Sequence, residues 1–221
     1  MKISILTLFP NMFDGFLNES IIKRAIEKDL VEFEIINFRD FSTLNNNQVD
    51  DTPYGGGAGM VLMCEPIYRA LESIKSDDSY VILLTPDGRV YNQSVARELK
   101  LKKHIILICG HYEGFDERVR SFVDSEISIG DYVLTGGEIP AMAISDSIVR
   151  LIDGVIAKES SENESFSENL LDYPVYTKPR EFMGMSVPEV LVSGDHKKIA
   201  EWRKQEQIKK TELRRNDLLN K

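Results

Sequence analysis

A run of four apolar residues, IILI at positions 105–108, is the feature that most constrains the fold. Short runs rich in β-branched residues are typical of strands covered on both faces of a parallel sheet. The run ends at Cys109-Gly110, and a glycine there lets the backbone approach a ligand closely. We therefore expect His111, Tyr112 and Glu113 on a loop at the carboxyl end of a strand, where open α/β sheets bind ligands.

Two further stretches repeat this pattern. IGDYVLTGG at 129–137 is a second glycine-bracketed loop, expected at a neighbouring strand end, and TPDG at 85–88 is a turn that follows an apolar strand at 81–84. Each loop alone is equally consistent with a tight βα turn or with the backbone lining of a pocket. Strands that alternate with helical patterns indicate an α/β fold with a mainly parallel sheet. The absence of Gly-x-Gly-x-x-Gly after the first strand counts against a dinucleotide site.

Periodicity predicts the remaining elements. The expected strands cover 1–9 and 31–36, and the expected helices cover 11–29 with a restart near 18–19, 65–74, 94–101, 138–156 and 196–219. Helix 138–156 is apolar on most sides, which indicates burial in the core or in a dimer interface. Residues 42–59 and 173–192 are expected to be irregular because they are rich in polar residues, glycine or proline.

Charge and cysteine content exclude several classes of protein. The net charge of −9 argues against a protein that coats nucleic acid indiscriminately. From position 172 onward, however, 11 Lys and Arg face 8 Asp and Glu, which suits either a basic surface for a polyanion or a solvated helix. The two cysteines show no metal-ligand spacing, and no apolar run approaches the roughly 20 residues that span a bilayer. A cytoplasmic protein without a membrane partner is expected.

The strings GHYEGFDERV and SIGDYVLTGGE resemble the bacterial tRNA (guanine-N1)-methyltransferases of the trefoil-knot (SPOUT) class. LFP at 8–10, VDDTPYGGG at 49–57 and YTKP at 176–179 also match, so the resemblance runs nearly end to end. It implies a knotted α/β domain over 1–157 that binds S-adenosylmethionine, a linker over 158–171 and a small helical tRNA-binding domain over 172–221. The implied reaction methylates N1 of the guanosine at position 37, 3′-adjacent to the anticodon. Periodicity cannot reveal the knot, which is expected from the resemblance alone.

The resemblance also implies roles for individual residues. Backbone groups at the three strand ends would hold the adenine and ribose, with Tyr112 and Glu113 near the methionine part. His111 stands where the family usually has arginine, and we interpret it as a surface histidine. The expected cofactor-binding residues are Leu84, Gly110, Tyr112, Glu113, Ile129, Gly130, Tyr132, Leu134, Gly136 and Gly137.

The implied catalytic residues are Glu164 and Arg150. Glu164 stands where the family pattern has an aspartate before Ser-Phe, and it would take the proton from N1. Its carboxylate reaches one methylene further, and a misplacement of about 1 Å can cost roughly a hundredfold in rate. Glu162 is the alternative base, and a linker that is merely solvated by its glutamates is a third interpretation. Arg150 would stabilise negative charge that develops on guanine O6.

Substrate contacts are expected from two regions. Asp50 and Gly57 belong to a glycine-rich stretch that is either a flexible linker or a loop against the target nucleotide. Arg214 and Arg215 would bind phosphates of the tRNA. The resemblance further implies a homodimer with a shared active site and a second domain that is shorter than in many relatives. It also implies dependence on Mg²⁺, although the sequence shows no metal-ligand cluster. The rival interpretations are a knotted methyltransferase with another target atom and a non-catalytic RNA-binding protein.

Overall fold

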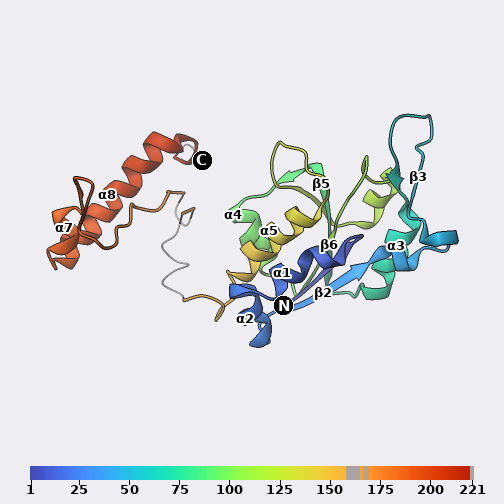
Figure 1. Ribbon diagram of the computed structural model, residues 1–221, viewed down its shortest axis with the longest axis horizontal. Coiled ribbons are helices and arrows are strands. Elements are labelled where there is room, and N and C mark those ends of the chain that lie inside the picture. The colour runs from blue at the N-terminus through green and yellow to red at the C-terminus, as the bar shows by residue number, and fades with distance from the viewer. Residues whose placement is uncertain (158–164, 167–168, 220–221) are drawn as a thin grey trace. The chain divides into compact units, whose positions relative to one another are not determined.

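The computed structural model describes residues 1–157, 165–166 and 169–219 (Figure 1). The chain divides into two compact units, Met1–Ile156 and Ala157–Lys221, and each is described by itself. Among the described residues, no helix is long and apolar enough to cross a membrane.

The first unit is built on a five-stranded sheet in the order β2-β1-β6-β5-β7. Every pairing between neighbouring strands of this sheet is parallel. The predicted α/β fold with a mainly parallel sheet is therefore confirmed, while the trefoil knot stays a prediction from the resemblance. The strands are β1 (Lys2–Thr7), β2 (Glu32–Asn37), β5 (Ser79–Val90), β6 (His104–Ile108) and β7 (Ser125–Ser128).

Helices cover both faces of the sheet, so its central strand is buried along its whole length. Along β6, Ile105 and Leu107 face one hydrophobic cluster, whereas Ile106 and Ile108 face the other. This alternation follows from the two-residue period of a strand. The first cluster is completed by residues of α2 (Ser20–Glu27), α4 (Gln93–Leu99) and α5 (Glu138–Val149), and the second by residues of α3 (Cys64–Ile74), η2 (Phe38–Phe41) and η4 (Glu117–Phe122).

Two predicted helices differ in extent from those observed. The 11–29 region is broken into η1 (Pro10–Phe13), α1 (Asp14–Leu17) and α2, with the restart where it was expected. The apolar helix ends at Val149 rather than at residue 156, since the chain leaves the helix at Arg150 and Gly154 adopts a positive φ of 90°. Its inward face is buried in the core through Ala141, Ile144 and Ile148.

One prediction about loops is wrong, and the expected connection at 42–59 is largely irregular. The TPDG turn at 85–88 lies inside β5, because Leu84 and Arg89 both pair with Ile127 of β7 and the residues between them bulge out. We call Thr85–Gly88 the β5 bulge. The irregular stretch at 42–59 contains η3 (Asn45–Asn47) and β3 (Asp50–Asp51), which pairs antiparallel with β4 (Val61–Leu62).

The second unit is also more regular than predicted. Residues 173–192 include a short hairpin of β8 (Glu181–Phe182) and β9 (Met185–Ser186) and the helix α7 (Glu189–Val192). The long helix α8 (His196–Arg214) and η5 (Asn216–Leu218) follow. Thr211 of α8 is fully buried, accepts a hydrogen bond from the Leu171 backbone at 2.9 Å and thereby fastens the preceding chain to the helix.

A buried histidine makes the stability of the first unit sensitive to pH. His104 lies at the start of β6, with its ring nitrogens 2.9 Å from the Ser4 hydroxyl and 2.8 Å from the Ser79 hydroxyl. Burial lowers the pKa of His104 below its ordinary value of 6.5. The folded state therefore takes up this proton less readily than the unfolded chain, and the stabilising contribution is present above pH 6.5 and lost as pH falls through the folded pKa.

We expect the free energy of unfolding to fall more steeply between pH 7 and 5 in the wild type than in His104→Gln. One proton contributes a slope of up to about 1.4 kcal/mol per pH unit. Urea unfolding at a series of pH values measures this difference. His196→Gln, at an exposed position at the start of α8, is the control and should follow the wild-type slope. Parallel curves for wild type and His104→Gln would contradict the prediction.

Candidate functional site

A pocket of about 270 Å³ opens at the carboxyl ends of β6 and β7 and beside the β5 bulge. We call it the strand-end pocket. Its position agrees with the rule that open parallel sheets bind ligands at this edge. The loops after β6 and β7 were predicted to follow neighbouring strands, and this prediction is wrong because β5 lies between β6 and β7. The lining includes all ten residues that the sequence singled out for a cofactor, namely Leu84, Gly110, Tyr112, Glu113, Ile129, Gly130, Tyr132, Leu134, Gly136 and Gly137.

The loops after β6 and β7 are joined backbone to backbone. The Gly137 amide donates to the Gly110 carbonyl at 2.9 Å, and His111 pairs with Gly136 in an antiparallel bridge. A Cβ on Gly137 would lie 2.6 Å from Cα of Cys109, so no larger residue fits without displacing the backbone. These glycines therefore allow the close approach of the two loops and also line the pocket.

A polar chain of three side chains lies beneath these loops. Glu138, the first residue of α5, is almost fully buried and accepts a 2.6 Å hydrogen bond from the Thr7 hydroxyl. His111 Nε2 lies 3.2 Å from the other oxygen of the same carboxylate, and the imidazole contacts the ring of Phe9. The prediction of a surface histidine is therefore wrong: the His111 side chain is 19 % exposed and is paired with a buried acid.

The glycine-rich stretch is attached to the pocket through Glu113. The Glu113 amide donates to the Met60 carbonyl at 3.0 Å, and a Cβ on Gly59 would lie 2.4 Å from the Glu113 side chain. Tyr112 adopts a positive φ of 59°, and its ring remains about half exposed at the pocket. Residues 59–60 and the loop after β6 thus form one continuous surface, which favours a loop at the site over a free linker.

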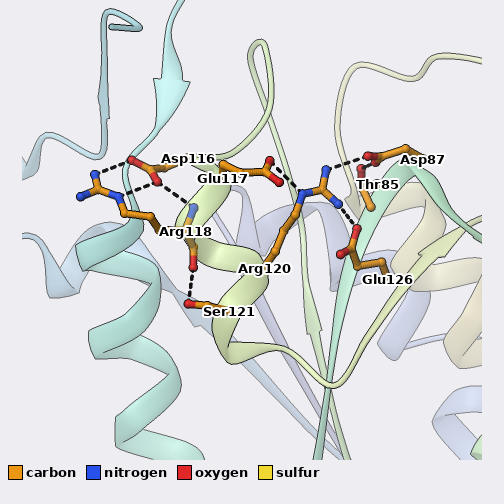
Figure 2. Close-up of polar contacts among 8 residues, drawn as sticks. All are labelled: Thr85, Asp87, Asp116, Glu117, Arg118, Arg120, Ser121 and Glu126. Atoms are coloured by element: carbon orange, nitrogen blue, oxygen red, sulfur yellow. Dashed lines mark hydrogen bonds and ion pairs between the residues drawn. The ribbon is translucent and has the colours of Figure 1, made fainter.

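Two arginines of η4 make contrasting ion pairs (Figure 2). Arg118 makes a local two-nitrogen contact with Asp116, two residues earlier, at 2.8 and 2.6 Å. Arg120 instead reaches Asp87 of the β5 bulge at 2.7 Å as well as Glu117 and Glu126. A hydrogen bond from Thr85 and, to a lesser extent, the charge of Arg120 hold the pKa of Asp87 below its usual range.

The other predicted residues lie outside the pocket lining. Asp50 is half buried in β3, and Gly57 adopts a φ of 134° in the loop between β3 and β4. Arg150 is the half-buried C-cap residue of α5. Glu164 and the alternative base Glu162 lie outside the described residues.

The two predicted phosphate ligands belong to the second unit. Arg214 is exposed at the last position of α8. Arg215 pairs with Asp217 through two nitrogens at 2.8 and 2.7 Å, and its guanidinium lies 6.0 Å from the ring of Phe166. Arg215 is therefore already engaged within its own unit, which makes Arg214 the more accessible cation of the pair.

Sequence reasoning missed several residues of the site. His111, Thr85 and Pro86 line the pocket although none was singled out as a cofactor-binding residue, and the buried Glu138 lines an adjacent cavity together with His111. The residues at 85–88 were expected at the end of a strand, and that expectation, although wrong about the element, could have placed Thr85 and Pro86 at the site. Within the described part of the chain, no group of three or more His, Cys, Asp or Glu residues could hold a metal ion.

Comparison with known proteins identifies what the chain resembles. The family model described as tRNA (guanine-1)-methyltransferase TrmD matches residues 1–221. A tRNA (guanine-N(1)-)-methyltransferase of Malacoplasma penetrans is 60% identical over 221 residues, covering 100% of this chain and 98% of that protein. Proteins of the same name from Carboxydothermus hydrogenoformans and Mycoplasma capricolum are 59% and 56% identical, covering 99% and 100% of this chain and 87% and 92% of those proteins.

The close approach at Gly137 generates a stability prediction. Gly137→Ala should lower the free energy of unfolding by about 1–3 kcal/mol, because overpacking against backbone atoms forces the loops apart. Gly15→Ala in α1 is the matched control, since a Cβ there meets nothing within 4 Å. It should leave stability unchanged or raise it by up to about 1 kcal/mol. Urea unfolding measures both, and equal stability of Gly137→Ala and wild type would refute the close packing.

Proposed function

The chain belongs to the tRNA (guanine-1)-methyltransferase family, and from this premise we propose that it transfers a methyl group from S-adenosylmethionine to N1 of the guanosine at position 37 of tRNA. The observation that carries the proposal is the strand-end pocket. The ten cofactor-binding residues selected by family resemblance come from three separate stretches of the chain, and all of them line that one cavity. A chance set of residues would be scattered over the surface.

The pocket suits S-adenosylmethionine. Its lining includes glycine backbone and apolar groups, which fit an adenine ring and a ribose. Glu113 contributes a carboxylate to the same lining, which favours the positively charged methionine part. When bound, this cofactor supplies an electrophilic methyl group on a sulfonium sulfur.

The protein must supply a base and a group that stabilises charge. We propose that Glu164 accepts the N1 proton as the new carbon–nitrogen bond forms, with Glu162 as the alternative. Arg150 stabilises the negative charge that develops on guanine O6. Glu164 adjoins Ser165, whose hydroxyl accepts a 3.0 Å hydrogen bond from the Asp172 backbone. That contact attaches the residue after Glu164 to Asp172 within the second unit.

We propose that the second unit binds the tRNA through its basic side chains. From Asp172 onward the chain has 11 Lys and Arg against 8 Asp and Glu, in contrast to the acidic remainder. Arg214 and, less directly, Arg215 contact phosphates and fix the register of the tRNA without reading its sequence. Asp50 and Gly57 approach the target nucleotide, because the loop that carries them is continuous with Glu113 through Gly59.

The assembly we propose is a homodimer with a shared active site. Exposed apolar side chains around the pocket support it: Val133 and Leu134 line the strand-end pocket, and Phe9, Met12 and Ile139 line an adjacent cavity of about 110 Å³. Such a rim is favourable when a second copy covers it. The tRNA substrate favours a cytoplasmic location. Dependence on Mg²⁺ stays a prediction from the resemblance, and chelation followed by re-addition of Mg²⁺ tests it.

The first assay uses purified protein, labelled S-adenosylmethionine and two tRNA transcripts that differ at position 37, G or A. We expect transfer to the G transcript alone. Glu164→Gln should lower the transfer rate by about 10²–10⁴-fold, because an amide cannot accept the N1 proton. Glu162→Gln is the matched control and should retain near wild-type transfer. If Glu162→Gln is the inactive variant, the base is Glu162; transfer to both transcripts would refute the guanine-N1 reaction.

Arg150→Met tests charge stabilisation. We expect kcat to fall by about 10²–10³-fold, because the developing charge on O6 loses its cation. Cofactor affinity, measured separately by calorimetry, should remain within about twofold, since Arg150 is absent from the pocket lining. Arg150→Lys should recover part of the rate. A loss of cofactor affinity equal to the loss in kcat would contradict the assigned role.

A further inference from the structure

One wall of the strand-end pocket is a bulge rather than a loop between elements. Thr85 and Pro86 line the pocket, and they belong to the β5 bulge. The bulge presses directly on β7, because a Cβ on Gly88 would lie 2.5 Å from the Ile127 amide nitrogen. Ile127 lines the same pocket. The width of the pocket therefore depends on how closely the β5 bulge is held against β7.

Arg120 connects the β5 bulge to two other segments. Its guanidinium lies 2.7 Å from Asp87 of the bulge and 3.0 Å from Glu117 of its own helix, and it contacts Glu126 of β7. Figure 2 shows the guanidinium between Glu117 on one side and Asp87 and Glu126 on the other. Asp87 in turn accepts a hydrogen bond from the Thr85 hydroxyl. The Arg120 side chain thus bridges the bulge, β7 and η4. We call the four charged residues Asp87, Glu117, Arg120 and Glu126 the Arg120 cluster.

The charge balance of the Arg120 cluster makes the contact between the β5 bulge and β7 depend on the positive charge of Arg120. One guanidinium faces three carboxylates, a formal sum of −2. Without Arg120, Asp87 on the bulge and Glu126 on β7 would carry like charges on the two segments that must stay in contact. Like charges at such a junction repel one another. Arg120 therefore supplies an attraction and also screens a repulsion.

We propose that Arg120 is a positioning residue that holds the Thr85–Asp87 wall against β7 and thereby sets the affinity of the strand-end pocket for S-adenosylmethionine. The inference rests on the proposed function, because it assumes that cofactor. Arg120 is absent from the pocket lining and acts through Asp87 and Thr85. Its effect therefore falls on cofactor binding and leaves the handling of the guanine unchanged.

The same helix provides a matched control. Arg118 is also an arginine of η4 with a two-nitrogen contact to a carboxylate, but its partner Asp116 is two residues away and does not belong to the β5 bulge. Glu117 provides a second control within the Arg120 cluster, since its side chain is 84 % exposed and lies on the same helix as Arg120. Neither residue joins the bulge to β7.

The experiment measures the Kd for S-adenosylmethionine by titration calorimetry on the full chain. Arg120→Met should raise the Kd by at least about tenfold, whereas Arg118→Met and Glu117→Gln should remain within about twofold of the wild type. Asp87→Asn should raise it less than Arg120→Met, because it weakens the contact without leaving three carboxylates unscreened. The double variant Arg120→Met with Asp87→Asn should bind more tightly than Arg120→Met alone.

Kinetics separate positioning from general loss of structure. In Arg120→Met the KM for S-adenosylmethionine should rise while kcat at saturating cofactor and the KM for tRNA stay within about twofold. A Kd unchanged in both Arg120→Met and Asp87→Asn, with wild type binding normally, overturns the role of Arg120 and leaves the proposed function intact. Should Arg120→Met fail to fold, Asp87→Asn decides alone. Failure of the wild type to bind S-adenosylmethionine overturns the proposed function itself.

Discussion

The close approach of two backbones, at Cys109-Gly110 and Gly136-Gly137, is the constraint on which the rest of the site depends. The Gly137 amide bonds to the Gly110 carbonyl at 2.9 Å, with no space for a Cβ beside Cys109. This contact joins the end of the buried central strand β6 to the start of α5. Both elements pack in the hydrophobic core, so the close-packed core holds this part of the pocket lining in place.

Much of the site was predictable because it consists of backbone at strand ends. The apolar run at 105–108 identified β6, and the glycines after it identified the pocket edge. The individual residues came from the family motifs, since periodicity alone gives no roles. The roles of Glu164 and Arg150 stay predictions, and Glu164 lies outside the described residues.

The failures concern contacts between residues distant in the sequence. His111 appeared solvent-facing because nothing near it in the chain explains its burial; its partner Glu138 is brought there by α5. The turn chemistry of Thr85–Gly88 was recognised, but no local signal shows that the residues on both its sides pair with one residue of β7. The apolar pattern likewise extended the helix to 156, whereas the chain geometry at Arg150 and Gly154 ends it earlier.

The continuity of β5 across its bulge has a consequence for the thermodynamics of ligand binding. The wall formed by Thr85 and Pro86 is anchored by strand pairing on both sides, so it is assembled before any ligand arrives. Backbone amides flanking the bulge exchange with solvent when the sheet opens, not when a surface loop fluctuates. Association at this wall therefore requires little ordering of the chain, and the conformational entropy lost on binding is mainly that of the ligand.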